Sequence, residues 1–145
     1  VPRDLTWAEV GADRLAVVVS PDHPWALGRQ PVPMAEFLAM PLLLREPGSG
    51  TRQALERAIA RHGRLAPPAL QLSTTTAIRG AALGGSAPTV LSELTVRADL
   101  AAGRLVSVAV TGLSVRRRLR AVWPRGVVLD GPARVLVEMA RGIRP

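Results

Sequence analysis

The fold is decided by residues 42–62, which read LLLREPGSGTRQALERAIARH. The three leucines at 42–44 predict a short buried strand, and the proline and glycines that follow end it. Apolar residues then recur at helical spacing, which predicts a helix over residues 51–62. Leu55 and Ile59 fall on one face of this helix, and we expect both to be buried.

Ser49, Gly50 and Thr51 lie at the turn between this strand and this helix, where a helix needs its N-cap. Glycine lets the backbone pass close to a ligand, and the free N–H groups of a helix start favour an anion. The turn either holds a carboxylate, sulfate or phosphate or is simply a capped turn, and the residues leave both interpretations open. A second hydroxyl-rich turn, residues 73–76, opens another predicted helix, on which Arg79 either pairs with an anion or is solvated.

Strands and helices alternate along the rest of the chain, which predicts an α/β fold with a mainly parallel sheet. The run LAVVV at 15–19 is typical of a strand buried on both faces. Further strands are predicted at 7–10, 70–72, 87–91, 105–110 and 115–123, and further helices at 34–40, 73–83, 93–102 and 130–143. The last helix is expected to bury a stripe formed by Val135, Leu136, Met139 and Ile143.

Composition excludes several kinds of chemistry. All 19 basic residues are arginines, so the chain has no Walker-type phosphate loop and no Schiff-base lysine. There is no cysteine, and His23 and His62 are far apart, so we expect neither a metal site nor a cofactor. Ser49 lacks both the spacing of a nucleophile elbow and a nearby histidine base, so no catalytic residue is predicted. No apolar run is long enough to cross a membrane, and a cytoplasmic location fits best.

The net charge of +8 suggests acidic partners, and the densest basic cluster is residues 116–120. This cluster is either a solvated strand face or a contact for DNA phosphates or for a partner subunit. Aromatic residues make up 3% of the chain and are far apart, so no stacking platform for single-stranded nucleic acid is predicted.

Several stretches resemble, in this order, parts of the effector-binding domain of LysR-type transcriptional regulators. They are LAVVVSPDHPWA at 15–26, PLLLREPGSGTR at 41–52, residues 73–85 with APTVLSE at 87–93, and LAAGRLV at 100–106. The resemblance implies a type 2 periplasmic-binding-protein-like fold, in which two lobes are joined by two crossing strands and hold a small ligand between them. It implies that residues 19–104 form lobe II, and that residues 1–18 and 105–145 form an incomplete lobe I.

The expected effector is a small anionic metabolite, and the expected ligand-binding residues are Ser49, Gly50, Thr51, Ser73 and Thr74, with Arg45 and Arg52 adding positive field. The resemblance implies a regulator and not an enzyme. It also implies that DNA is contacted only through a winged helix-turn-helix that has no counterpart here, as in an N-terminally truncated member. The full-length protein would be a homodimer or tetramer. The alternatives are a solute-binding protein or enzyme domain on the same fold, and direct nucleic-acid binding through the arginine-rich strand.

Overall fold

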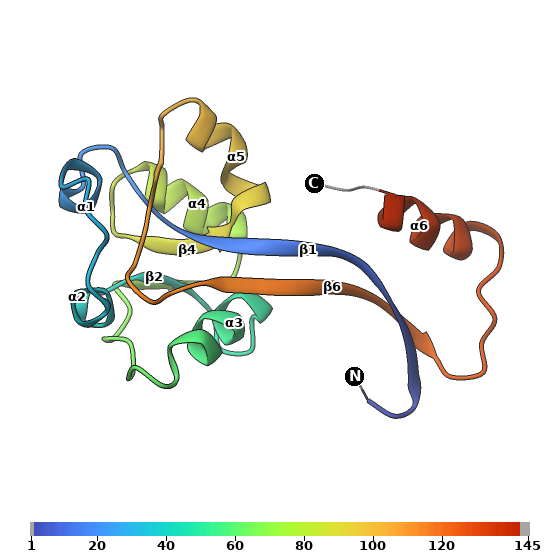
Figure 1. Cartoon of the computed structure of the whole chain (residues 1–145). Coiled ribbons are helices and arrows are strands. Elements are labelled where there is room, and N and C mark those ends of the chain that lie inside the picture. The colour runs from blue at the N-terminus through green and yellow to red at the C-terminus, as the bar shows by residue number, and fades with distance from the viewer. Residues whose placement is uncertain (1, 143–145) are drawn as a thin grey trace. The chain divides into compact units, whose positions relative to one another are not determined.

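The structure, a computed structural model, describes residues 2–142, which divide into two compact units (Figure 1). Of the described residues, 2–13 and 116–142 belong to unit 1, and 14–115 form unit 2. Ile143, one of the four residues of the predicted apolar stripe, lies outside the described residues. The predicted lobe boundaries stay a prediction.

Unit 2 is built on a mixed sheet. Its strands are β1 (Leu5–Val19), β2 (Leu43–Arg45), β3 (Leu70–Leu72), β4 (Thr89–Ser92) and β5 (Val106–Val108), in the order β3-β2-β4-β1-β5. β2 pairs in parallel with β3 and β4, whereas β1 is antiparallel to β4 and β5. The prediction of a mainly parallel sheet was therefore wrong for β1. An apolar run indicates burial on both faces of a strand, but it does not fix the strand's direction.

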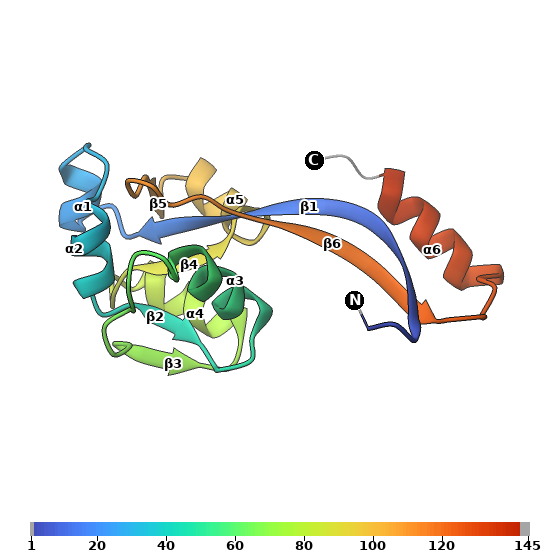
Figure 2. The same ribbon diagram turned by 60° about the horizontal axis from the view of Figure 1, so that its bottom comes forward.

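Helices cover both faces of this sheet. They are α1 (Pro24–Leu27), α2 (Met34–Ala39), α3 (Gly50–Ile59), α4 (Thr75–Leu83) and α5 (Glu93–Ala101). Figures 1 and 2 show α3 on one side of the strands and α4 and α5 on the other. Leu15, Val17 and Val19 of β1 pack into the core on the α1–α3 side, while Ala16 and Val18 pack with α4 and α5. This alternation explains why all five residues are apolar.

The central predictions of the sequence analysis are confirmed in unit 2. The strands predicted at 42–44, 70–72 and 87–91 lie side by side in one sheet, as β2, β3 and β4. Leu55 and Ile59 of α3 are 1% and 2% exposed. The hydrophobic face predicted for this helix is therefore the face that it packs on the sheet.

Unit 1 contains the first part of β1 and two further elements, β6 (Val115–Pro124) and α6 (Gly131–Gly142). β6 pairs with β1, and Arg117 forms an ion pair of 2.6 Å with the buried Asp13. Part of the arginine-rich face is occupied within unit 1, because Arg120 lies 4.5 Å from the centre of the Trp7 ring and Arg118 pairs with Glu9.

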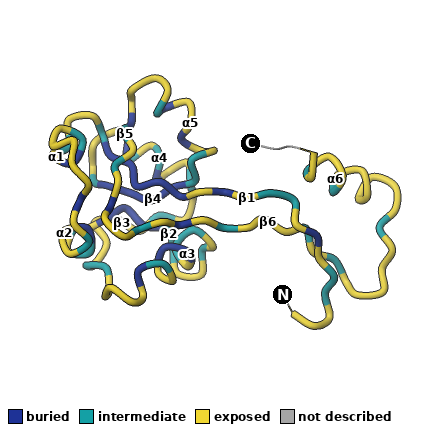
Figure 3. The backbone as a smooth tube through the Cα atoms, in the orientation of Figure 1, coloured by how far each residue is buried: buried dark blue, intermediate teal, exposed yellow. Residues whose placement is uncertain are grey.

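The predicted burial of the α6 stripe was wrong. Val135, Leu136 and Met139 are 47%, 68% and 63% exposed, and α6 has no buried residue among those described. Figure 3 shows the contrast between α6 and the buried strands of unit 2. Helical periodicity identifies the face that a helix can bury, but burial also needs a second layer, which the described part of unit 1 does not supply.

One buried carboxylate fixes α4 to α5. Asp99 of α5 is fully buried and accepts hydrogen bonds from Arg79 Nε at 2.5 Å and Arg79 Nη2 at 2.7 Å. Arg104 Nη2 donates to the same carboxylate at 2.8 Å. Arg79 therefore pairs with a carboxylate of the chain and not with an external anion, while its side chain stays 34% exposed to solvent. Its hydrogen bonds, and then those of Arg104, lower the pKa of Asp99 from the ordinary 3.8 to about 2.

Replacing Leu55 by alanine tests the core assignment. Because the side chain is buried, Leu55→Ala is expected to lower the free energy of unfolding by about 2–5 kcal/mol, measured by urea denaturation. Leu94→Ala is the control, since Leu94 is 49% exposed on α5, and it should change the free energy by less than about 0.5 kcal/mol. Equal effects of the two substitutions would contradict the core assignment.

Asp99 predicts a pH dependence of stability. A carboxyl group whose pKa is lowered in the folded state stabilises it fully above the unfolded pKa, and this contribution is lost as the pH falls through the folded pKa. The difference in unfolding free energy between the parent and Asp99→Asn should therefore shrink as the pH falls from about 4 to about 2. Arg97→Gln, at an exposed arginine of α5, should keep the acid dependence of the parent. A parent–variant difference that is constant with pH would refute the assignment.

Candidate functional site

Two helix starts meet at one edge of the sheet. β2 and β3 are parallel neighbours, with Arg45 at the end of β2 in register with Leu72 at the end of β3. α3 follows β2 and α4 follows β3, so both helices begin beyond the carboxyl ends of these strands. In open α/β sheets this is the edge at which ligands bind. All five predicted ligand-binding residues belong to these two turns.

The start of α3 offers polar groups and open space. Ser49 is the residue before the helix, and its side chain makes no capping hydrogen bond to the first turn. Gly48 has a φ of +91°, a left-handed conformation that favours glycine. Gly50 has no such requirement, and a Cβ added to it would meet no heavy atom within 4 Å. The backbone of Gly48 makes the turn, whereas Gly50 leaves the space above the first turn of α3 open.

The start of α4 is a capped helix. Thr74 Oγ1 accepts a hydrogen bond from the backbone N–H of Ala77 at 3.1 Å, which makes Thr74 the N-cap. Ser73, the residue before it, is exposed. The next residue, Thr75, accepts a hydrogen bond from Arg45 Nη1 at 2.8 Å. The turn therefore combines an ordinary cap with a side-chain bond to the end of β2.

Arg45 links the two turns, a role that the sequence analysis missed. Besides Thr75 it binds the neighbouring Glu46, through Nε at 2.8 Å and Nη2 at 2.9 Å. These bonds lower the pKa of the Glu46 carboxyl group. An acid next to an arginine is visible in the sequence, but the bond to Thr75 depends on the register of β2 and β3.

Arg52 is tied to three elements. Its Nε donates to Glu56 on α3 at 2.8 Å, and its Nη1 donates to the Arg45 carbonyl at 3.1 Å and to Gln71 of β3 at 2.9 Å. Arg45 and Arg52 were expected to add positive charge at this edge. That expectation needs correction, because Glu46 and Glu56 pair with them and offset their charges. What this edge offers an anion is therefore chiefly hydroxyl and backbone N–H groups.

The two histidines lie outside this edge. His23 is the N-cap of α1, where its Nδ1 accepts a hydrogen bond from the backbone N–H of Trp25 at 3.1 Å. His62 follows the end of α3 and accepts a hydrogen bond from Arg61. Across residues 2–142, no group of three or more His, Asp or Glu side chains is placed to hold a metal ion. None of the helices described in this range is long and apolar enough to cross a membrane.

Comparison with known sequences identifies the family of this chain. The family model of the LysR substrate binding domain matches residues 1–143. An uncharacterized HTH-type transcriptional regulator of Mycobacterium bovis is 41% identical over 139 residues, which are 89% of this chain and 45% of that protein. A RuBisCO operon transcriptional regulator of Acidithiobacillus ferrooxidans is 36% identical over 132 residues, covering 90% of this chain and 42% of that protein. The chain thus spans less than half the length of these relatives.

Solved structures agree with this assignment. The CcmR regulatory domain of Synechocystis, in complex with 2-PG, is 26% identical with a TM-score of 0.84, covering 98% of this chain and 69% of that chain. The regulatory domain of HypT from Salmonella typhimurium, at 18% identity, shows the fold alone, with a TM-score of 0.74 over 97% of this chain and 66% of that chain. The predicted α/β fold of the type 2 periplasmic-binding-protein kind is confirmed. The chain belongs to the LysR substrate-binding domain family.

Proposed function

We propose that this chain is the effector-sensing part of a LysR-type transcriptional regulator and that it binds a small organic anion at the starts of α3 and α4. The observation that carries the proposal is the placement of both helix starts beyond the carboxyl ends of β2 and β3, joined by the bond from Arg45 to Thr75. Ser49, Gly50 and Thr51 would contact the anion from α3, and Ser73 and Thr74 would line the facing turn.

The available donors suit a carboxylate or another small anion. The Ser49 hydroxyl is not used to cap α3, and the space beyond Gly50 is open to a ligand atom. The first N–H groups of α3 have no partner within the helix, and they carry the positive end of its dipole. Each hydrogen bond to a charged group contributes about 1.5–3 kcal/mol, so two or three of them support a dissociation constant from roughly millimolar to micromolar.

The relatives support a regulator and not an enzyme. The Mycobacterium bovis and Acidithiobacillus ferrooxidans relatives are named as transcriptional regulators, and the CcmR regulatory domain was solved with 2-PG. A protein of Anaeromyxobacter dehalogenans named as a phosphonates import ATP-binding protein also matches 97% of this chain, at 32% identity. In the whole protein, a ligand would change regulation only by binding two conformations with different affinity. We assign DNA reading to a helix-turn-helix domain outside these 145 residues and, because the target is DNA, place the protein in the cytoplasm. Lobe II at 19–104 and a homodimer or tetramer of the full-length protein remain part of this proposal.

The open space at Gly50 gives a first test. A panel of small carboxylates, phosphate, sulfate and 2-PG is expected to contain a ligand that raises the melting temperature of the chain. Gly50→Ala should lower the affinity of the chain for that ligand by about tenfold or more, because the added Cβ enters the space that the ligand needs. Its free energy of unfolding should not fall, since alanine is the better helix former.

Gly80→Ala is the matched control for this test, because Gly80 is a helical glycine of α4 whose added Cβ also meets no atom within 4 Å. It should leave affinity unchanged. If Gly50→Ala binds the ligand as tightly as the parent does, the ligand does not approach the start of α3 and the proposal is wrong.

The hydroxyl of Thr51 gives a second test. Thr51→Val removes the hydroxyl and keeps a similar side-chain shape. It should therefore lower the affinity for the same ligand by about tenfold. Thr76→Val removes an exposed hydroxyl from α4 outside the proposed contact set and should bind as the parent does. Titration calorimetry measures both. If Thr51→Val binds the ligand as tightly as the parent does, Thr51 does not contact the ligand and is only part of a capped turn.

A third test concerns DNA. The net charge of +8 predicts weak binding to any duplex, because arginines neutralise phosphates without reading bases. Fluorescence anisotropy with two unrelated duplexes should give equal affinities, and both should fall steeply between 50 and 200 mM salt, as is general for phosphate contacts. A salt-tolerant preference for one duplex would show that this chain reads sequence itself.

A further inference from the structure

A groove lies between α1 and β5, the last strand at one edge of the unit 2 sheet (Figure 2). Its volume is about 280 Å³, close to the lower end of the roughly 300–1,000 Å³ that is usual for small-molecule sites. It is lined by residues 25–26 of α1, by residues 29–31 and by residues 106–109. None of the five proposed effector contacts belongs to this β5 groove, so it is a separate place on unit 2.

The apolar wall of the β5 groove is fixed in place. Trp25 is 6% exposed and belongs to the core cluster against which Val106 and Val108 pack. The Trp25 indole N–H donates to Glu36, and its ring lies 6.2 Å from the ring of Phe37, centre to centre. An apolar ligand body would therefore meet a preformed surface, which reduces the ordering cost of binding.

The backbone of β5 offers polar groups along the same groove. The Val32 N–H donates to the Ala109 carbonyl at 2.8 Å, and the Thr111 N–H donates to the Val32 carbonyl at 2.9 Å. Residues 109 and 111 thus direct their backbone groups away from β1, and every second residue of an extended chain does the same. Ser107, two residues earlier, therefore presents its N–H and carbonyl at the open edge, where the groove lies.

Arg29 supplies a cation in an unusual backbone conformation. Its φ is +52°, and among the described residues no other residue except glycine has a positive φ. Glycine would adopt this conformation without strain, so the backbone alone does not explain an arginine here. Arg29 is exposed and, within residues 2–142, is in no ion pair with a carboxylate. Its charge is therefore available to a ligand in the groove.

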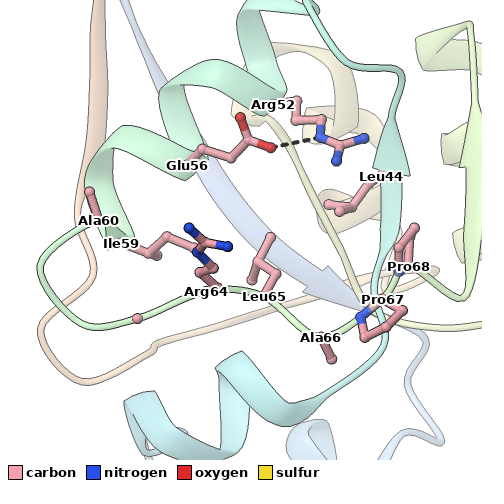
Figure 4. Close-up of a pocket in the computed structure, with 11 residues that line it drawn as sticks. Leu44, Arg52, Glu56, Ile59, Ala60, Arg64, Leu65, Ala66, Pro67 and Pro68 are labelled. Atoms are coloured by element: carbon pink, nitrogen blue, oxygen red, sulfur yellow. Dashed lines mark hydrogen bonds and ion pairs between the residues drawn. The ribbon is translucent and has the colours of Figure 1, made fainter.

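The hollow beside α3 differs from the β5 groove in its charge. It is bounded by β2, by α3 and by residues 63–68, and there Arg52 donates to Glu56 at 2.8 Å, as the dashed line in Figure 4 shows. The cation of that hollow is thus offset by a carboxylate on the same wall. The residues that line the β5 groove include Arg29 and no carboxylate, so an anion would meet attraction without repulsion.

We propose that the β5 groove is a second ligand site, which takes a small carboxylic acid with an apolar ring or chain. The apolar body would contact Trp25, Val106 and Val108. The carboxylate would accept hydrogen bonds from the Arg29 guanidinium, whose planar donors match its two oxygens, and the Ser107 N–H would be a further donor. This site does not depend on the effector proposal, because the two share no residue.

Phenylacetate is the probe, and the neutral phenylacetamide of nearly the same shape is its control. Titration of the whole ¹⁵N-labelled chain, followed by NMR, should show saturable shifts of the Ala26, Ser107 and Ala109 amides with phenylacetate. Phenylacetamide should bind about tenfold more weakly, because it lacks the charge that Arg29 recognises. Equal affinities for the two compounds, or the absence of saturable shifts at these amides, would overturn the proposal.

A charge substitution at the groove has a matched control on α5. Arg29→Gln should lower the affinity for phenylacetate by about tenfold and leave the affinity for phenylacetamide unchanged. Arg97→Gln removes the same charge from an exposed position outside the groove and should bind phenylacetate as the parent does. If Arg29→Gln binds phenylacetate as tightly as the parent does, Arg29 does not hold the carboxylate and the proposal is wrong.

The variant Arg29→Gly distinguishes a binding role from a structural one. Because glycine adopts a positive φ freely, this variant should keep or raise the melting temperature of the chain. Its affinity for phenylacetate should nevertheless fall by about tenfold, since the guanidinium is gone. A lower melting temperature together with the lower affinity would mean that Arg29 serves the turn and not a ligand, which would refute the proposal.

The outcomes also separate this site from the proposed effector site. Thr51→Val should bind phenylacetate in the β5 groove as the parent does, whether or not the effector proposal holds. Phenylacetate shifts confined to residues 49–51 and 73–75 would refute the second site. Shifts at the groove that follow protein concentration and not phenylacetate would mean that a second copy of the chain covers it, which would also refute the proposal.

Discussion

Burial of the last part of β1, residues 15–19, on both faces is the constraint on which unit 2 depends. The side chains of residues 15–19 alternate between two hydrophobic clusters, one under α1–α3 and the other under α4 and α5. The backbone of the same segment pairs with β4 on one edge and with β5 on the other. A segment enclosed on four sides tolerates a polar side chain only if the group finds a partner. The neighbouring β4 shows such a case, because the fully buried Thr89 donates its hydroxyl to the Leu43 carbonyl at 2.8 Å.

Local pattern was sufficient to predict most of the elements of unit 2. The apolar runs became β2, β3 and β4, and the helical spacing around Leu55 predicted the buried face of α3, because both signals depend on residues close in sequence. The direction of β1 was not predictable in this way, since the same run suits either direction. The exposure of Val135, Leu136 and Met139 was not predictable either, because it depends on which other segments lie nearby.

The candidate site shows the same division. Ser49, Gly50 and Thr51 could be located at a helix start from the glycines and hydroxyls alone. The contacts that hold the site were missed, because they join residues distant in sequence: Arg45 and Thr75 are 30 positions apart, and Arg79 and Asp99 are 20 apart. A long arginine side chain reaches partners on neighbouring elements, so its role emerges only when strand register and helix packing are known. The two glutamates that offset Arg45 and Arg52 illustrate why a count of arginines overstates the local field.

The division of β1 between two units has a consequence for the order of folding. Unit 2 is one continuous segment, whereas unit 1 joins residues from both ends of the chain, with Asp13 and its partner Arg117 separated by 104 positions. At a synthesis rate of about 5–20 residues per second, β6 leaves the ribosome roughly 5–20 seconds after the part of β1 that it pairs with. During that interval the first part of β1 is an unpaired strand edge. Glu9 and Asp13 place negative charges on it, and charges on an open edge discourage pairing with another nascent chain.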